Sequence, residues 1–394
     1  MSKLTIAQLD LAERRVFVRA DLNVPLDRGA VTDETRLRAV VPTIQHALKA
    51  GAAVVLASHL GRPKGKVTPE FSLRPVAARL EALLGQRVPL APDCVGAETL
   101  EWALRVSPGE VLLLENLRFH AEEEANDDDF ARSLAALGQC YVNDAFAAAH
   151  RAHASIAAIT RHLQPAAAGL LMQQELAALS RILESPERPR VAILGGAKVS
   201  DKLTLVEHLL ERVDALLVGG GMAFTFLRSL GHGVGRSLVE PDQIETARRA
   251  LEAARRRGVG LVLPVDAIVA DGPDSGRGRA VGIREIPADQ MGLDIGPRTV
   301  ERFAGALKGA RTIVWNGPMG VFERPAFAAG TLGLARAVAE ASAFSVVGGG
   351  DTVAAVTQAG VAERIGYIST AGGAFLEFLE GRKLPGVEAL TDAG

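Results

Sequence analysis

Short apolar runs alternate with turns and helical patterns along almost the whole chain, and this alternation limits the possible folds more than any other feature. The runs cover residues 15–19, 53–57, 111–114, 141–143, 191–194, 215–218, 260–264, 312–315 and 344–347. Runs this short, apolar and rich in β-branched residues are typical of parallel strands buried on both faces. Amphipathic stretches between them, such as 73–84 and 241–257, can form the crossover helices. The sequence therefore predicts an α/β fold with two open, doubly wound, Rossmann-like parallel sheets.

A chain of 394 residues is too long for one compact core, so we expect two domains. The strand–helix pattern breaks at 164–169, and the next stretch reads as one amphipathic helix that Ser185 and Pro186 end. This interdomain helix can be a hinge or a spacer. The tail is too short to fold alone and must pack on a domain already formed. The expected division is 1–169, interdomain helix 170–185, 186–372 and tail 373–394.

Charge and composition exclude several classes of protein. The formal net charge is −2, whereas nucleic-acid binders usually carry a basic surplus. No apolar run approaches the roughly 20 residues that span a bilayer, and the first ten residues lack the apolar core of a signal peptide. Cys94 and Cys140 lack metal-type spacing, so we expect buried, reduced thiols. We therefore expect a cytoplasmic protein that binds neither nucleic acid nor membrane.

Five glycine-rich turns lie at expected strand ends in the second half. They lie at 195–198, 219–221, 316–318, 348–352 and 371–373. Ligands bind beyond the carboxyl ends of strands in open α/β sheets, and glycine turns let backbone N–H groups and helix N-termini approach phosphate. The P-loop motif and the dinucleotide-binding glycine motif are both absent. The turns therefore predict a phosphate-rich ligand held by a different arrangement.

Two features of these turns bear on chemistry. Lys198 and Lys202 are four residues apart, so on a helix they would share one face at its N-terminal end. An anion between them would offset the unfavourable helix dipole, although a solvated lysine face is the alternative. Asp351 lies among the glycines, where a carboxylate suits a bound Mg²⁺; it could also cap a helix that starts at Thr352.

Cationic side chains replace glycines at the strand ends of the first half. Arginine forks grip phosphate and carboxylate through two hydrogen bonds, and several arginines on one edge would repel each other without an anion. The histidines among them could be metal ligands or a general base, but their arginine neighbours argue against a metal. This half therefore predicts a site for a small polyanion, built from Arg19–Asn23, Arg36, His59–Arg62, Arg118 and His150–His153.

A phosphate-rich site with Mg²⁺ in one half and a polyanion site in the other together predict phosphoryl transfer. At these residues the chain resembles the phosphoglycerate kinase family from end to end. The resemblance rests on short sequence blocks that occur in the same order as in that family. No single block identifies the family, but all of them together do. These blocks cover 18–25, 58–63, 114–119, 143–146 with 150–153, 195–202, 219–223, 315–323, 348–352 and 384–387.

The resemblance implies reversible transfer from 1,3-bisphosphoglycerate to ADP, giving 3-phosphoglycerate and ATP, by direct in-line transfer in a cleft that closes by hinge motion. It implies a monomer in glycolysis, with Mg²⁺ as cofactor and a tail that returns to the N-terminal domain. Residues implied to bind phosphoglycerate are Asp21, Leu22, Asn23, Arg36, His59, Leu60, Gly61, Arg62, Arg118 and Arg151. Those implied at the nucleotide are Lys202, Glu323, Gly349, Gly350, Asp351 (also the metal ligand) and Thr352. Those implied in catalysis are Arg36, Lys198 and Gly373.

The chain departs from the family pattern at a few positions. Ala20 and Leu22 stand where Val and Phe are usual, which are apolar exchanges. Ala371 replaces the first of three glycines, and Phe375 replaces a small polar residue. We expect φ below zero at Ala371, because the remaining glycines can supply any left-handed turn. Two other functions are possible on this fold: a protein that binds phosphorylated ligands without catalysis, and a kinase for another carboxylate. The presence of Arg36, Lys198 and Asp351 argues against the non-catalytic protein.

Overall fold

The chain folds into two compact units. The structure, a computed structural model, describes residues 3–184 and 187–393. The first unit comprises Met1–Ala177 with Lys383–Gly394, and the second comprises Ala178–Arg382. Helix α6, Leu170–Glu184, begins in the first unit and ends in the second. The predicted end of this helix at Ser185 and Pro186 lies outside the described residues. The predicted boundaries of the two binding domains stay a prediction.

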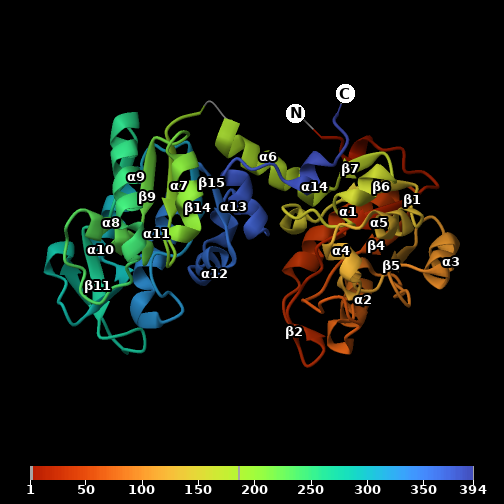
Figure 1. The fold of residues 1–394 in the computed structure, drawn as a ribbon, viewed down its shortest axis with the longest axis horizontal. Coiled ribbons are helices and arrows are strands. Elements are labelled where there is room, and N and C mark those ends of the chain that lie inside the picture. Colours follow the sequence, from red (N-terminus) through yellow and green to blue (C-terminus); the bar gives the residue numbers. More distant parts are fainter. Residues whose placement is uncertain (1–2, 185–186, 394) are drawn as a thin grey trace. The chain divides into compact units, whose positions relative to one another are not determined.

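The first unit is built on a five-stranded parallel sheet (Figure 1) in the order β5-β4-β1-β6-β7. Its strands are β1 Arg15–Arg19, β4 Ala53–Ala57, β5 Val111–Leu113, β6 Cys140–Asn143 and β7 Ala166–Ala168. A small hairpin joins β2 Leu26–Asp27 to β3 Ala30–Val31. The helices are α1 Thr35–Lys49, α2 Arg74–Leu84, α3 Ala97–Arg105, α4 Ala121–Glu124, α5 Asp128–Ala135 and α14 Pro385–Glu388.

The second unit contains a six-stranded parallel sheet in the order β10-β9-β8-β14-β15-β16. These strands are β8 Arg190–Leu194, β9 Ala215–Val218, β10 Gly260–Val262, β14 Thr312–Asn316, β15 Phe344–Gly348 and β16 Tyr367–Ile368. An antiparallel sheet adds β11 Asp266–Ala270, β12 Arg279–Gly282 and β13 Met291–Ile295. The helices are α7 Leu203–Leu209, α8 Met222–Ser229, α9 Ile244–Arg257, α10 Pro297–Leu307, α11 Ala329–Glu340, α12 Gly350–Gln358 and α13 Gly373–Leu379.

Burial explains why the strand sequences are continuous apolar runs. Every residue of β4 and of β14 is buried, as expected for strands covered on both faces. One core packs Leu37 and Ile44 of α1 against Val16 and Val54 of the first sheet. In each parallel sheet the chain starts at a central strand, moves outward to one edge and then crosses to the other side, which is the doubly wound order. The predicted fold class is confirmed.

All nine predicted runs form strands, but several strands were not predicted. Residues 164–169 were expected to break the pattern, and this was wrong for β7. Ala166–Ala168 lacks β-branched residues, yet it pairs with β6, and the Ala166 carbonyl also accepts a hydrogen bond from Thr391 N at 2.9 Å. The antiparallel sheet was missed because it has no counterpart in a purely parallel pattern. β16 was missed because it has only two residues.

The two ends of the chain pair within the first unit (Figure 1). Lys3 forms an antiparallel bridge with Asp392, and its ammonium group lies 2.8 Å from the Asp392 carboxylate. Cys94 and Cys140 are buried and neither forms a disulfide, as predicted. None of the described helices combines the length and apolar character needed to cross a membrane.

Candidate active site

In the sheet of the first unit, the strand order reverses between β1 and β6. Ligands are therefore expected beyond the carboxyl ends of β1 and its neighbouring strands. The segment after β1 is tied to the segment after β4. Leu22 N donates to Ser58 Oγ at 2.9 Å, and Gly61 N donates to Asn23 Oδ1 at 2.9 Å. The structure therefore brings two of the predicted binding segments, 21–23 and 59–62, together.

Arg36 joins the same site from the first turn of α1. Its guanidinium lies 2.6 Å from Asp21 Oδ2, and Asp21 is almost fully buried. Asp21 Oδ1 also accepts a hydrogen bond from Asn23 N at 3.1 Å. The Asp21 carboxylate thus holds the Arg36 side chain at the end of β1, and 34% of that side chain remains exposed.

Arg118 reaches the site through a short 3₁₀ turn, Leu117–Phe119, capped by Asn116. The Asn116 side chain accepts from Arg118 N and from Leu60 N, and it donates to the Leu60 carbonyl at 2.7 Å. Arg118 itself donates to the Gly61 carbonyl at 2.9 Å. Arg118 is buried, and its Nε forms no hydrogen bond within the described residues, although Glu124 Oε1 lies 3.4 Å away. A buried guanidinium with an unused donor suits an anionic ligand.

Electrostatics show that the cations converge. Burial places the pKa of His59 well below its usual range, and Arg19, Arg118 and Arg36 lower it further by repulsion. The pKa of His153 falls to about 3, first through burial and then through Arg19, Arg118 and Arg151. Both imidazoles are therefore neutral at pH 7, while the guanidiniums around them keep their charge. Neutral histidines reduce the repulsion within a site that is already strongly positive.

Arg19 was predicted as part of the polyanion site, but no role was predicted for Ser155 and Glu123, which hold it. Arg19 is fully buried; its Nε donates to Ser155 Oγ at 2.8 Å, and a terminal nitrogen lies 3.2 Å from His59 Nδ1. Ser155 Oγ in turn donates to Glu123 Oε1 at 2.6 Å. Glu123 is also fully buried, so its carboxylate balances the charge of Arg19 through the serine. Only a buried arginine at the end of β1 could have signalled this network.

The other predicted residues of the first unit lie nearby with fewer described contacts. Arg62 is exposed and directly follows Gly61. Arg151 is half-buried, and its charge acts on both Arg118 and His153. Leu22 and Leu60 are buried, so their contribution to a ligand would come from the backbone.

In the second unit, four of the five glycine-rich turns are joined by hydrogen bonds. Gly196 N donates to the Pro318 carbonyl, and Gly220 N donates to the Met319 carbonyl. Gly317 N donates to Thr352 Oγ1 at 2.7 Å. An ideal Cβ on Gly220 would lie 2.6 Å from Gly196 N, so only glycine permits this approach.

These contacts correct one expectation. Several glycine N–H groups predicted to face phosphate bind other protein groups instead. Those of Gly195, Gly196, Gly220 and Gly317 bind neighbouring turns, and that of Gly219 binds the carbonyl of Leu194 at the end of β8. The glycines mainly let the turns pack tightly. The N-terminus of α12, where Gly349 has a φ of 93° and no side chain caps the helix, offers N–H groups to an anion.

A cavity of about 440 Å³ lies against these turns. Its polar lining includes Glu323 and Asp351 beside Gly196. Its apolar lining, which the sequence analysis did not identify, comes from Phe224, Leu238, Met291, Leu293 and Val321. A mostly apolar cavity of this size with a few polar groups suits a small organic ligand.

Lys198 and Lys202 do not share a helical face, contrary to expectation. Lys198 lies in the loop before a 3₁₀ turn, Ser200–Lys202, and α7 starts only at Leu203. Lys198 is exposed, and the described residues offer its ammonium group no partner. Lys202 donates to the side chain and the carbonyl of Asn316, and burial lowers its pKa to about 8. One lysine is thus free and the other is held at the end of β14.

Asp351 is not a helix cap, so that alternative was wrong. α12 starts at Gly350 with Gly349 as its N-cap, which places Asp351 in the first turn. Its carboxylate is exposed at the cavity and has no hydrogen-bond partner among the described side chains, although it acts electrostatically on Lys202. Thr352 is buried and holds Gly317.

Comparison with known proteins decides the family. The family model described as phosphoglycerate kinase matches residues 6–382. Phosphoglycerate kinases from Acidobacterium capsulatum and Moorella thermoacetica are 57% and 56% identical, each over 100% of both chains. The solved structure of phosphoglycerate kinase from Coxiella burnetii is similar with a TM-score of 0.91 and 45% identity, covering 98% of each chain. The chain belongs to the phosphoglycerate kinase family.

Membership of the phosphoglycerate kinase family confirms the resemblance, and the structure tests the expectation for Ala371 in the glycine turn at 371–373. Glu13, Arg28, Lys64 and Asn126 are the described non-glycine residues with positive φ; Ala371 is not among them, as predicted. Ala371 is buried, and its N–H donates to Ser369 Oγ at 3.2 Å. Gly373 is exposed at the start of α13. Phe375 is fully buried against Gly348: an ideal Cβ there would lie 2.6 Å from its ring.

We expect Ala371→Gly to change kcat less than about threefold and to lower the free energy of unfolding by about 0.5–1 kcal/mol, because glycine adds disorder to the unfolded chain. Steady-state kinetics and urea denaturation test both parts. A glycine variant that is clearly more stable would mean that the alanine is strained.

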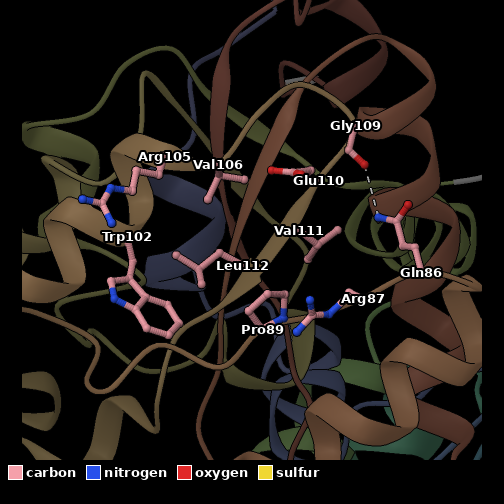
Figure 2. A pocket seen from close by; sticks show the side chains of 10 residues that line it. All are labelled: Gln86, Arg87, Pro89, Trp102, Arg105, Val106, Gly109, Glu110, Val111 and Leu112. Atoms are coloured by element: carbon pink, nitrogen blue, oxygen red, sulfur yellow. Dashed lines mark hydrogen bonds between the residues drawn. The ribbon is translucent and has the colours of Figure 1, made fainter.

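A larger cavity of about 600 Å³ lies in the first unit (Figure 2). It borders β5, the edge strand of the first sheet, and Trp102, Pro89 and Leu112 contribute apolar walls. It contains none of the predicted site residues of this phosphoglycerate kinase family member. Cavity size alone therefore does not identify the active site.

Proposed function

We propose that this chain catalyses reversible, Mg²⁺-dependent transfer of a phosphoryl group from 1,3-bisphosphoglycerate to ADP, giving 3-phosphoglycerate and ATP. The observation that carries the proposal is the convergence of four charged side chains, Arg19, Arg36, Arg118 and Arg151, around two neutral histidines in one unit. Such a site favours a small molecule with several negative charges. Family membership over residues 6–382 supports the specific substrate.

The acid is proposed to bind the first unit through arginine forks and through the loops tied together after β1 and β4. Guanidiniums bind phosphate and carboxylate oxygens through paired hydrogen bonds, and burial strengthens those bonds. Arg118 supplies the buried contact and Arg62 an exposed one. The proposed set is Asp21, Leu22, Asn23, Arg36, His59, Leu60, Gly61, Arg62, Arg118 and Arg151.

The nucleotide is proposed to occupy the cavity of the second unit. Its apolar walls would hold the base, and the exposed Glu323 would accept hydrogen bonds from ribose hydroxyls. The phosphates would meet the N-terminus of α12, where the free N–H groups and the helix dipole favour anions. The proposed phosphate contacts are Lys202, Gly349, Gly350, Asp351 and Thr352.

Asp351 fits a Mg²⁺ ion. Its carboxylate is exposed at the cavity, without a described hydrogen-bond partner, beside the backbone N–H groups proposed for phosphate. Mg²⁺ commonly takes one or two carboxylates together with phosphate oxygens and water. When bound, the ion would neutralise part of the phosphate charge.

Three residues are proposed to act on the transferred group itself. The transition state of phosphoryl transfer spreads charge over the equatorial oxygens, so positioned cations and N–H groups accelerate it. Lys198 is free to reach that group, and Gly373 offers an exposed backbone at the start of α13. Arg36 is held by Asp21 here, so its guanidinium is already oriented and must share its donors with the substrate.

Because the two ligands bind different units, we propose that the units approach each other by hinge motion when both ligands are present, excluding water. The radius of gyration measured by solution X-ray scattering should then fall with 3-phosphoglycerate and MgATP together, and fall less with either alone. Identical scattering in all four states would contradict closure.

We also propose that the protein is a cytoplasmic monomer that acts on small molecules in glycolysis. The direct test of the function is ATP formation: the purified protein should produce ATP from ADP and 1,3-bisphosphoglycerate when Mg²⁺ is present. Light output from luciferase reports the ATP formed. No ATP above the level without protein would remove the proposed activity.

A further inference from the structure

A cysteine, a histidine and an aspartate meet in the first unit, and none of the three belongs to the proposed substrate residues. Asp93 and Cys94 lie in the loop before α3, and His120 directly follows the 3₁₀ turn that carries Arg118. We propose that Asp93, Cys94 and His120 form a binding site for one thiophilic divalent cation of the Zn²⁺ class.

The geometry is close to what such an ion needs. One ligand atom from each residue lies within 4.8 Å of the other two, and His120 Nε2 is 2.7 Å from Asp93 Oδ1. Tetrahedral Zn²⁺ with bonds of about 2.0–2.3 Å requires ligand atoms about 3.3–3.8 Å apart. Side-chain movements of about 1 Å would therefore complete the site.

The three ligands are held in place before any ion arrives. The Asp93 carbonyl accepts from Thr99 Oγ1 at 3.2 Å, and Asp93 Oδ1 accepts from Cys94 N at 2.6 Å. The His120 ring packs against Phe130 with 5.3 Å between ring centroids. Cys94 is buried, whereas the side chains of Asp93 and His120 are 41% and 26% exposed. An ion can therefore enter from the exposed side, which also leaves room for water as a fourth ligand.

Charge around the site favours a cation. Glu122 acts electrostatically on His120, and the buried Glu123 acts on Cys94, in addition to the carboxylate of Asp93 itself. On binding, the Cys94 thiol releases its proton to solvent and its sulfur bonds the ion as a thiolate. His120 loses to solvent the Nε2 proton that it shares with Asp93, and it binds the ion through Nε2 as the neutral tautomer that carries its proton on Nδ1. No oxidant or reductant is required.

Cys140 provides a matched control within the same unit. It is also buried and unpaired, but the described residues place it in no group of potential metal ligands. A thiophilic ion should therefore bind at Cys94, which has Asp93 and His120 beside it, and not at Cys140, although both cysteines are buried.

Co²⁺ titration of the full chain, without nucleotide, tests the site. Co²⁺ bound to a thiolate gives a charge-transfer band in the near ultraviolet, and a carboxylate site such as Asp351 gives none. We expect one Co²⁺ per chain with this band, displaced by Zn²⁺. The band should survive Cys140→Ser and disappear in Cys94→Ser, and calorimetric Zn²⁺ affinity should fall more than about 100-fold in Cys94→Ser, since loss of a direct ligand should exceed the 10–100-fold cost of losing an outer partner.

His120→Gln provides a second test if Cys94→Ser does not fold, because His120 is partly exposed and its replacement leaves the thiol in place. That variant should also bind Zn²⁺ more than about tenfold more weakly. Absence of a thiolate band in the unmodified protein, or equal Zn²⁺ affinity in the unmodified protein and the His120→Gln variant, would overturn the proposal.

Discussion

Replacing Lys198 with alanine should lower kcat by on the order of 10²-fold or more, while nucleotide binding weakens far less. Lys198 is exposed in the loop after β8 and has no partner among the described residues, so its removal leaves the packing unchanged. A cation that meets the phosphoryl group only in flight stabilises the transition state more than the bound nucleotide. Single-turnover and steady-state kinetics separate the two effects.

Two other lysines serve as comparisons. Lys202→Ala should mainly weaken nucleotide binding, because Asn316 holds Lys202 at the loops that are proposed to bind phosphate. Lys308→Ala should change neither kcat nor nucleotide binding, since Lys308 is exposed beyond the end of α10. An unchanged kcat in Lys198→Ala would exclude Lys198 from the chemistry.

Replacing Arg62 or Arg118 with alanine should raise the KM for 3-phosphoglycerate by at least about tenfold, because each charged hydrogen bond contributes about 1.5–3 kcal/mol. The KM for ATP should stay nearly unchanged, since both arginines lie in the first unit and the proposed nucleotide cavity lies in the second. Initial rates with each substrate varied in turn measure both constants.

The two arginines differ in a way that helps interpretation. Arg118 is buried and holds the Gly61 carbonyl, so its loss should also lower the thermal midpoint, whereas Arg62 is exposed and should leave it unchanged. Arg87→Ala is the control, because Arg87 is an exposed arginine of the same unit that lines the cavity beside β5. An effect confined to the KM for ATP would mean that the two binding sites are assigned in reverse.

The sequence predicted the parallel sheets because parallel strands buried on both faces form apolar runs, and every residue of β4 and β14 is buried. It could not predict β7, whose three alanines carry no strand preference and depend on β6 and the C-terminal segment for pairing. Such long-range pairing leaves no local signal.

Candidate site residues could be predicted where a charged side chain lies near the end of a predicted strand. They could not be predicted where a residue takes its role from being buried against another one. Arg36 and Arg118 stood out as arginines near strand ends, but Glu123 and Ser155 have no local signature for holding Arg19. The apolar walls of the second cavity, such as Phe224 and Leu238, look like core residues in sequence. The glycines drew attention to turns of which four line the second cavity, although many of their N–H groups bind neighbouring backbone instead.

The central claim is tested most directly by consumption of ATP in the presence of 3-phosphoglycerate and Mg²⁺, measured by coupling ADP formation to an indicator reaction. We predict turnover that requires both 3-phosphoglycerate and Mg²⁺ and is much slower with other small carboxylates. Binding of both ligands without turnover would indicate a phospho-ligand binding protein, and faster turnover with another carboxylate would indicate a different kinase; either result would contradict the proposed function.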